Sequence, residues 1–296
     1  MMGRGGRTMR ETGLDSLIQK LKSTDQRALP EGVFPVKESQ PRLIEASVYN
    51  PVICLILQGS KETTSHKGTV HLAEGDMLVV SHDTPVTARI IRAPYLALIM
   101  PIDLARIRSL ADSLPDRPSP DSAGTGVMRS AVADKALLHT LERLLALEPG
   151  SADDTVLTPL LLTELHYRLL MSPAGGMLRR LLSPTSQESR IARVASLIRR
   201  NYAQPQRLPD LAREAGMGQS AFHQHFKALT GTTPLQFQKD VRLSEALRLL
   251  EEGTQSVTQI GYAVGYESPA QFSREFSRRF GRPPQQVLKQ PLSAAE

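Results

Sequence analysis

Two runs of polar side chains, about 50 residues apart, have the types and spacing to read the edges of DNA bases. Each run follows a glycine, Gly216 in the first case and Gly265 in the second. Amide, hydroxyl and imidazole groups exchange hydrogen bonds with base edges, and an arginine pairs bidentately with guanine O6 and N7. Arg274 is therefore the sharpest single prediction. The candidates for base contact are Gln219, Ser220, His223, Gln224, Ala270, Gln271 and Arg274.

A second set of residues suits contacts with phosphate oxygens. Cationic side chains, hydroxyl groups and the backbone amides at a helix start all bind phosphate without reading sequence. The alternative is an ordinary solvated surface, which is the commonest role of an exposed polar residue. The candidates for phosphate contact are Lys227, Thr232, Thr233, Arg242, Arg278, Arg279 and Arg282.

The elements that position these residues are written twice in the chain. Phe222, Phe226, Gly231 and Pro234 recur 50 residues later as Phe272, Phe276, Gly281 and Pro284. From Gly216 to Gly265 the offset is 49, so the second copy carries one extra residue in its turn. Each copy reads as helix, glycine turn, helix and a glycine–x–x–proline exit. This repeat predicts a pair of helix-turn-helix units within 208–288.

The helices of the repeat have regular apolar faces. The pattern predicts second helices over 220–229 and after Ser268, which caps a helix with Pro269 at an early position. The second helix of each unit, which carries the candidates for base contact, is called its reader. A helix over 236–252 lies between the units and would fix the spacing of the two readers. A spacing of ~34 Å would let both enter successive major grooves.

The region from Glu31 to Met100 has a different character, with short runs rich in Val and Ile separated by turn signals. Such a pattern predicts a small β-barrel or sandwich. The run from Val52 is apolar on both faces, so it is buried on both sides or lines a cavity. Its residues Cys54, Ile56 and Gln58 are the candidates for a sensor or ligand pocket. Strands are expected at 43–48, 52–57, 69–72, 77–80, 86–91 and 95–100.

Helical spacing marks several further segments. Residues 1–10 are expected to be a disordered arm, and residues 115–126, rich in Pro, Ser, Asp and Gly, a loop. Pro159 is expected in the first turn of its helix. These apolar helices could cover the barrel or form a dimer interface. Helices are predicted near 14–21, 103–114, 136–145, 158–171 and 178–182.

Charge and composition limit the function. The chain has 296 residues and a net charge of +6, and from Gln187 onward it carries 15 Lys and Arg against 10 Asp and Glu. A basic C-terminal part favours a polyanionic partner. The single cysteine excludes an intramolecular disulfide. No apolar run is long enough for a bilayer and no signal peptide is recognisable, so a cytoplasmic protein without membrane contact is expected.

Metal chemistry is not favoured. His66, His71 and His82 lie in the predicted barrel, but they form no His-x-His pair of the kind that metal-binding cupins carry. We therefore expect no cofactor, no metal and no catalytic residue. A cupin-type metal enzyme with a helical appendage remains as an alternative, and an architectural DNA binder without signal response is another.

Both copies of the repeat resemble a known DNA-binding domain. The run Leu208–Ala212, Ala215–Gly216–Met217, Phe222–His223 and Phe226–Lys227 is similar to the first half of the AraC/XylS DNA-binding domain. Gly265–Tyr266–Glu267–Ser268 and the run from Gln271 to Phe276 resemble its second half, although Gly261 replaces the usual alanine.

The N-terminal part, from Asn50–Pro51 to Ala93–Pro94–Tyr95–Leu96, resembles the cupin-like AraC-type N-terminal domain. The resemblance implies a transcriptional regulator whose N-terminal domain senses a signal, forms a homodimer, and controls binding to promoter DNA and RNA polymerase. An α+β protein is therefore expected, with a small-molecule effector and an open sign of regulation. Its expected parts are an arm over 1–29, a sensor domain over 30–182, a linker over 183–190, a DNA-binding domain over 191–290 and a tail over 291–296.

Overall fold

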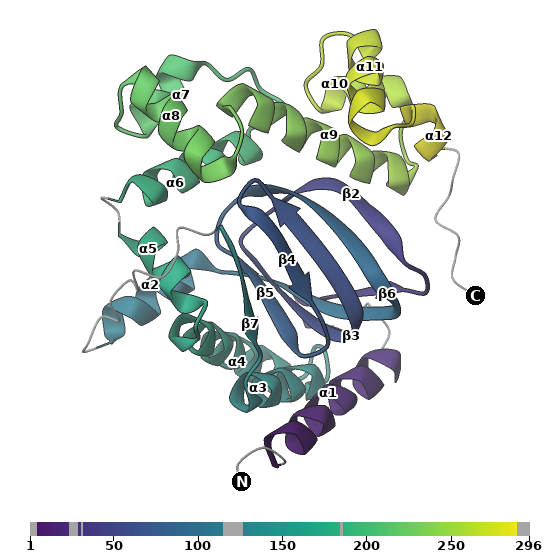
Figure 1. The fold of residues 1–296 in the computed structure, drawn as a ribbon, viewed down its shortest axis with the longest axis vertical. Helices are drawn as coiled ribbons and strands as arrows, with labels where there is room; N and C mark the ends of the chain where they lie inside the picture. Colours follow the sequence, from purple (N-terminus) through teal and green to yellow (C-terminus); the bar gives the residue numbers. More distant parts are fainter. Residues whose placement is uncertain (1–4, 24–28, 31, 115–126, 184–185, 289–296) are drawn as a thin grey trace. The chain divides into compact units, whose positions relative to one another are not determined.

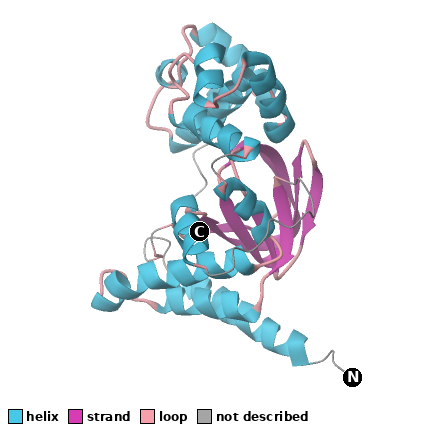
Figure 2. Ribbon diagram, turned by 90° about the vertical axis from the view of Figure 1, so that its left-hand side faces the viewer, coloured by secondary structure: helices cyan, strands magenta, loops and turns pink. Residues whose placement is uncertain are grey.

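A computed structural model describes residues 5–23, 29–30, 32–114, 127–183 and 186–288 of the chain. Two compact units make up the chain. The first consists of residues 1–43, 50–82 and 88–189, and the second of residues 190–296 with the short segments 44–49 and 83–87. Strands occur only before residue 133 among the described residues, and the elements after it are all helices (Figures 1 and 2).

A seven-stranded antiparallel sheet forms the centre of the first unit, in the order β1-β6-β3-β5-β7. Strand β2 also pairs with β6, and β4 with β3. Since β3 and β6 pair with different partners along their lengths, the sheet folds over rather than lying flat. The strands are β1 (Phe34–Glu38), β2 (Arg42–Tyr49), β3 (Val52–Ser65), β4 (Gly68–Leu72), β5 (Asp76–Val80), β6 (Thr84–Pro101) and β7 (Met128–Val132).

Two strands run on where the sequence predicted breaks. Strand β3 continues to Ser65, past the end predicted at residue 57, and the two predicted strands at 86–91 and 95–100 are one strand, β6. Gly59 has a φ of +82°, and a Cβ there would lie 2.4 Å from the Arg92 carbonyl oxygen. Glycine thus bends β3 against β6 without ending it, because strand partners continue on either side. The sequence also failed to predict β1 and β7.

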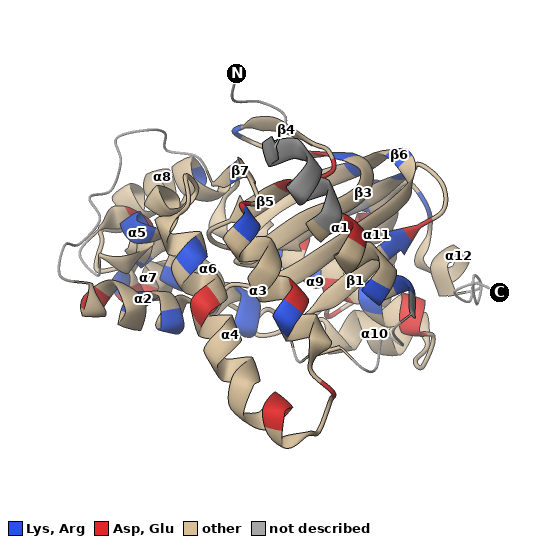
Figure 3. Ribbon diagram, turned by 90° about the horizontal axis from the view of Figure 1, so that it is seen from below, with Lys and Arg blue, Asp and Glu red and all other residues tan. Residues whose placement is uncertain are grey.

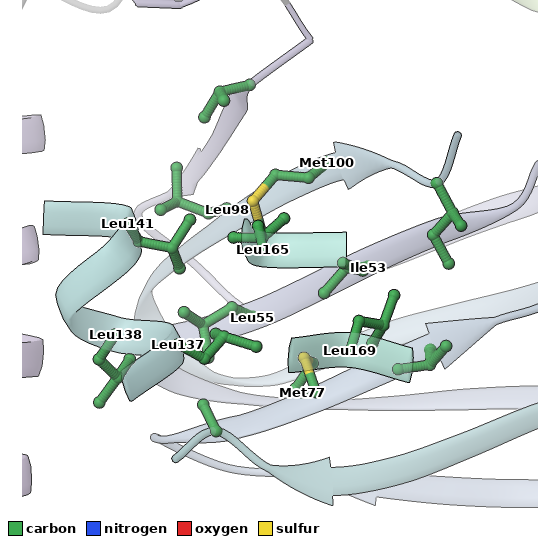
Figure 4. Close-up of a cluster of buried hydrophobic side chains, with 14 of the residues drawn as sticks. Ile53, Leu55, Met77, Leu98, Met100, Leu137, Leu138, Leu141, Leu165 and Leu169 are labelled. Carbon is green, nitrogen blue, oxygen red and sulfur yellow. The ribbon is translucent and has the colours of Figure 1, made fainter. Parts of the chain in front are cut away.

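Helices cover one face of the sheet. They are α1 (Gly5–Ser23), α2 (Leu104–Ser113), α3 (Lys135–Ala146), α4 (Ala152–Met171) and α5 (Gly175–Leu182). The odd residues of β3 from Ile53 to Leu57 pack with Leu137, Leu141 and Leu165 of α3 and α4 in one buried cluster (Figure 4). Cys54 and Ile56, on the other face of β3, are equally buried. The prediction of a strand buried on both faces is confirmed.

Two helix boundaries in this unit were predicted wrongly. Helix α1 begins at Gly5, so residues 5–10 are not a disordered arm. Once Leu14 and Leu17 pack on the core, each added residue gains a backbone hydrogen bond at little further cost. Helix α4 begins at Ala152 behind a Ser151 cap, which leaves Pro159 inside the helix. Pro159 lies on the exposed side, where water can satisfy the carbonyl it leaves unbonded.

A buried histidine ties α4 to α2. The Nε2 atom of His166 accepts a hydrogen bond from the Asp103 backbone N–H at 2.9 Å, while Nδ1 lies 2.6 Å from the Leu162 carbonyl oxygen. Both bonds form only when the ring is neutral with its proton on Nδ1. Burial, more than any neighbouring charge, lowers the pKa of His166 and favours this form.

The second unit contains seven described helices and two buried clusters. The helices are α6 (Gln187–Arg200), α7 (Leu208–Glu214), α8 (Gln219–Thr230), α9 (Pro234–Glu252), α10 (Val257–Ala263), α11 (Pro269–Phe280) and α12 (Pro284–Leu288). The start of α6 makes residues 187–190 of the predicted linker helical. The predicted loop over 115–126 and the tail over 291–296 lie outside the described residues.

Candidate nucleic-acid interface

The first helix-turn-helix consists of α7 and α8. Gly216 lies in the turn between them with a φ of +62°, a conformation that favours glycine. Phe222 and Phe226 are fully buried in a cluster that includes Leu211 and the start of α9. Burying two rings on one side of α8 turns its opposite side outward. The N-cap of α8 is Gly218, which offers no side chain to bond the free amides of the first turn.

The second helix-turn-helix, α10 and α11, repeats this plan with stronger ends. Ser256 and Gln259 form a reciprocal capping box on α10, and the Ser268 side chain caps α11. Gly265 has a φ of +90°, and a Cβ there would lie 2.3 Å from the Ala203 carbonyl oxygen. The extra residue of the second copy falls in this turn, between Gly265 and the cap of α11.

The predicted base-contacting residues gather at the starts of α8 and α11. On α8, Gln219, Ser220 and Gln224 are exposed and His223 is half-buried. On α11, Ala270, Gln271 and Arg274 are all exposed. With helix starts 50 residues apart, Gln224 and Arg274 occupy equivalent positions, so the two helices present an amide and a guanidinium at the same place. Arg274 bonds no acceptor among the described residues.

A part-buried polar network holds α11, and sequence reasoning missed it. The carboxylate of Glu275 accepts hydrogen bonds from Lys239 at 2.9 Å, from the Tyr266 hydroxyl at 3.0 Å and from Gln271 at 3.2 Å. Partial burial works against the charge, but these three donors prevail and lower the pKa of Glu275. Burial, followed by the charge of Glu275, raises the pKa of Tyr266 well above its usual range. The carboxylate therefore fixes the turn, α9 and α11 together.

Helix α9 connects the two halves. Its first part, with Phe237 and Val241, packs in the first cluster, and its later part, with Leu243 and Leu250, packs in the second. Nineteen residues at 1.5 Å each make it about 28.5 Å long, somewhat shorter than the ~34 Å of one turn of B-DNA. Figure 1 shows α8 and α11 toward opposite ends of α9.

Arg242 has a different use from the predicted phosphate contact. Its guanidinium donates to the carbonyl oxygens of Tyr202 at 2.7 Å and Ala203 at 3.2 Å, and stands 5.9 Å from the centre of the Tyr266 ring. Gln238 donates to the Tyr202 and Gln204 carbonyl oxygens, at 2.9 and 2.6 Å. These two side chains of α9 clamp the segment from Tyr202 to Gln204, which also touches the Gly265 turn. No local pattern could reveal this, since the partners lie about 40 residues apart.

The remaining predicted phosphate-contacting residues lie at the surface or at helix ends. Lys227, Arg278 and Arg279 are exposed. Thr233 caps α9 by accepting from the Gln236 backbone N–H at 3.2 Å, and the Thr232 backbone N–H bonds the Thr230 hydroxyl at 3.4 Å. Arg279 also lies 3.8 Å from the buried Asp240 carboxylate. Arg282 is half-buried.

The predicted sensor residues all lie on β3 in the first unit. Cys54 is 2% exposed and Ile56 fully buried, while Gln58 is half-buried. Sequence reasoning missed a neighbour of Cys54, the buried Lys61, whose Nζ atom donates to Cys54 Sγ at 3.4 Å. His71 pairs with Glu62 and His82 with Ser81, so the barrel histidines have separate partners.

In the described ranges, no group of three or more His, Cys, Asp or Glu side chains is arranged to hold a metal ion. No helix in the described part of the chain combines the length and the apolar character that crossing a bilayer requires.

Comparison with known proteins agrees with this arrangement. Residues 30–177 match the profile of the AraC-type transcriptional regulator N-terminus, and residues 211–290 match that of a helix-turn-helix domain. The virulence regulon transcriptional activator VirF of Yersinia enterocolitica is 26% identical over 236 residues, which cover 79% of this chain and 87% of VirF. The regulator ExsA of Pseudomonas aeruginosa is 25% identical over 231 residues, which cover 75% of this chain and 80% of ExsA.

Solved structures share the fold over nearly the whole chain. ToxT from Vibrio cholerae bound to an unsaturated fatty acid superposes with a TM-score of 0.63 at 13% identity, covering 90% of this chain and 96% of ToxT. An apo structure of a ToxT variant from the same organism gives a TM-score of 0.64 at 11% identity, covering 89% and 99%. The predicted α+β fold is thereby confirmed. The profile match over half of the chain, joined to a helix-turn-helix domain, shows that this protein belongs to the AraC-type family of DNA-binding transcriptional regulators, a family of regulators and not of enzymes.

Proposed function

We propose that α8 and α11 enter successive major grooves on one face of a promoter. The supporting observation is that each helix turns a buried phenylalanine pair inward and leaves the polar side chains of its first turns exposed. In this proposal the base edges are read by Gln219, Ser220, His223, Gln224, Ala270, Gln271 and Arg274. Gln224 would favour adenine and Arg274 guanine, because amide and guanidinium groups match those base edges.

Phosphate contacts would set the register of the two helices. Lys227, Arg278 and Arg279 supply charge, while Thr232, Thr233 and Arg282 lie at the glycine exits that follow each reader. Arg242 stays outside this proposed set, because its guanidinium is engaged with backbone carbonyl groups. Its proposed role is to hold the spacing between the two readers.

We propose that the first unit binds a small amphipathic acid as effector. ToxT, which shares the fold, has been solved with an unsaturated fatty acid. In this chain the buried face of β3 offers Cys54 and Ile56 as apolar contacts, Gln58 near its edge, and the ammonium of Lys61 as a counter-charge. A fatty acid should raise the melting temperature of the protein, and its methyl ester should not; equal effects would exclude recognition of the carboxylate.

We also propose that the protein forms a homodimer in which α4 packs against α4 of a second copy. Val156, Leu160, Tyr167 and Met171 are 59, 61, 40 and 51% exposed. Their spacings of four, seven and four residues return to one helix face, and no charged residue lies between Thr155 and Thr163 of α4, whose ribbon is drawn in Figure 3. The set is symmetric about the point between residues 163 and 164, so an antiparallel two-fold pairing would set Leu160 against the partner's Tyr167.

The dimer is tested by mass measurement in solution. Leu160→Glu should give monomers, whereas Val132→Glu, which alters another exposed apolar residue of the same unit, should leave the dimer intact. A wild-type monomer at micromolar concentration would exclude the dimer. Each subunit of the dimer would bind one copy of a non-palindromic site, so a promoter would carry two copies.

In the proposed mechanism, an effector in the first unit changes promoter occupancy and thereby the access of RNA polymerase. VirF is an activator by name, and activation is the sign that we propose for this chain. The protein would act in the cytoplasm, where its promoters are. The proposed organisation is a sensor domain over 30–182, a linker over 183–190 whose last four residues begin helix α6, and a DNA-binding domain over 191–290.

Genome-wide mapping of bound sites, followed by footprinting on the strongest, tests the proposal. Two protected stretches about one helical turn apart, with different sequences and resistance to competitor DNA, are expected. Binding without sequence preference would support an architectural protein instead. Stoichiometric metal in the purified protein would favour the cupin-type enzyme.

A further inference from the structure

The bend in β3 brings together two residues that a regular strand would keep apart. Cys54 and Lys61 are an odd number of positions apart, so a regular strand would point them to opposite faces. The bend at Gly59 shifts the alternation by one. Its amide donates to Glu74 at 3.1 Å, and Glu74 pairs with Arg92 at 2.8 Å, so β6 and the β4–β5 turn both fix the bend.

The result is a buried pair of reactive side chains. Cys54 and Lys61 are each 2% exposed, and Lys61 Nζ lies 3.4 Å from Cys54 Sγ. The chain has only one cysteine, so no second thiol can resolve an oxidised Cys54 within the same molecule. The amine of Lys61 is the nucleophile already in contact with the sulfur.

We propose that Cys54 and Lys61 are an oxidant-sensitive pair that closes into a covalent sulfur–nitrogen bond, a sulfenamide. The oxidant is hydrogen peroxide, which is small enough to reach a buried sulfur during local opening. The Cys54 sulfur attacks one peroxide oxygen, the O–O bond breaks, and a sulfenic acid and one water form. The Lys61 nitrogen then attacks the sulfur, the S–O bond breaks, and the oxygen leaves as a second water with a proton from nitrogen.

The balance is one thiol, one amine and one peroxide giving one sulfenamide and two waters. Sulfur loses two electrons and peroxide gains them. The crosslink would tie the two arms of β3 across its bend and convert the Lys61 amine into the nitrogen of the sulfenamide. An excess of a small thiol reverses the step, because the thiol attacks the sulfur and releases the amine.

Intact-mass spectrometry of the full chain, treated with hydrogen peroxide under native conditions, tests the proposal. The expected product is lighter by about 2 Da, returns to the starting mass with dithiothreitol, and maps to a peptide joining Cys54 and Lys61. Lys61→Met, which keeps the length of the side chain, should accumulate oxygen on Cys54 instead. Lys37→Met, at a lysine bonded to the Leu21 carbonyl oxygen, should crosslink as the wild type does.

Contrary outcomes are equally specific. An unchanged mass, or a wild-type product that retains oxygen either on Cys54 or between the two residues, would overturn the sulfur–nitrogen assignment. Should Lys61→Met fail to fold, Lys61→Arg keeps the charge but removes the amine and should behave likewise. These masses do not depend on DNA binding or on effector binding, so the proposed function stands or falls separately.

Discussion

Gly216 and Gly265 sit in equivalent turns of the two helix-turn-helix halves, yet their surroundings differ sharply. A Cβ at Gly216 would meet only a distal nitrogen of Arg190, at 3.6 Å, whereas at Gly265 it would meet the Ala203 backbone at 2.3 Å. The second turn is pressed against a segment that α9 clamps through Gln238 and Arg242. The second half is thus locked to the connecting helix α9. The first turn is bonded instead to α6, where Arg190 donates to the Gly216 carbonyl oxygen at 3.3 Å and Arg193 to the Glu214 carbonyl oxygen at 2.6 Å, and both bonds are exposed.

The reading helices differ in the same sense. Helix α11 has a serine cap, an early proline and the Glu275 network, while α8 begins at an uncapped glycine. At the positions equivalent to Tyr266 and Glu275 the first half has Met217 and His225, which form no such network in the described structure. We infer that α11 is held rigidly and contacts DNA bases through a cationic side chain, Arg274. Helix α8 is held less rigidly and presents the neutral Gln224 at the same position. The two halves thus share the same buried apolar positions and turn glycines, but they differ in the polar side chains that fix the second helix of each half.

The largest expected effect is the loss of stability when alanine replaces the glycine of each turn. Gly265→Ala should destabilise the protein by about 3 kcal/mol or more, because a positive φ and a backbone clash act together. Gly216→Ala should cost about 1 kcal/mol, since only the φ is strained. Urea denaturation of both variants measures the difference. Equal losses would contradict the view that the second turn is the locked one.

The two readers are compared next by shortening their equivalent side chains. Arg274→Ala should weaken specific DNA binding by about 1–3 kcal/mol and relax base preference at one position, because a bidentate pair with guanine is lost. Gln224→Ala should cost less and relax preference at a different position. Selection of binding sites from random DNA measures both. If the loss were uniform over all sequences, Arg274 would be a phosphate contact instead.

The Glu275 network offers a test by pH. Because its donors lower the pKa of Glu275 in the folded state, the carboxylate adds stability above the unfolded value of about 4.3, and this is lost as the pH falls through the folded pKa. Glu275→Gln should therefore cost about 1–2 kcal/mol at pH 7 and progressively less below about pH 4, as urea denaturation over a pH series would measure. Glu267→Gln, at an exposed carboxylate of the same turn, is the matched control.

The sequence predicted the helix-turn-helix elements of this protein better than the long-range polar contacts that hold them in place. The repeated Phe, Gly and Pro positions placed both helix-turn-helix units, because apolar spacing and glycine turns act locally. Gly59 and Pro159 misled the prediction, since both residues usually end an element and here tertiary neighbours carry the element through. The contacts of Arg242 and Lys61 could not be predicted at all. One depends on carbonyl groups about 40 residues away, and the other on a bend that reverses which face a side chain takes.

The smallest effect concerns the helix caps, and it tests whether the difference between the readers can be transferred. Ser268 accepts from the Gln271 backbone N–H at 3.4 Å, so Ser268→Ala should cost about 1 kcal/mol by leaving that amide without an acceptor. The backbone at Gly218 is extended, with a φ of −66° and a ψ of 153°, and a Cβ there meets nothing within 4 Å. Gly218→Ser should therefore be tolerated and stabilise α8 by a few tenths of a kcal/mol. Thermal unfolding and amide hydrogen exchange in the first turn of each helix measure these changes. If Gly218→Ser slows amide exchange in α8 and also narrows the base preference of that half, then the mobility of the uncapped first turn is what lets α8 accept different bases. If exchange slows and the base preference stays the same, the side chains of α8, and not its cap, determine which bases it accepts.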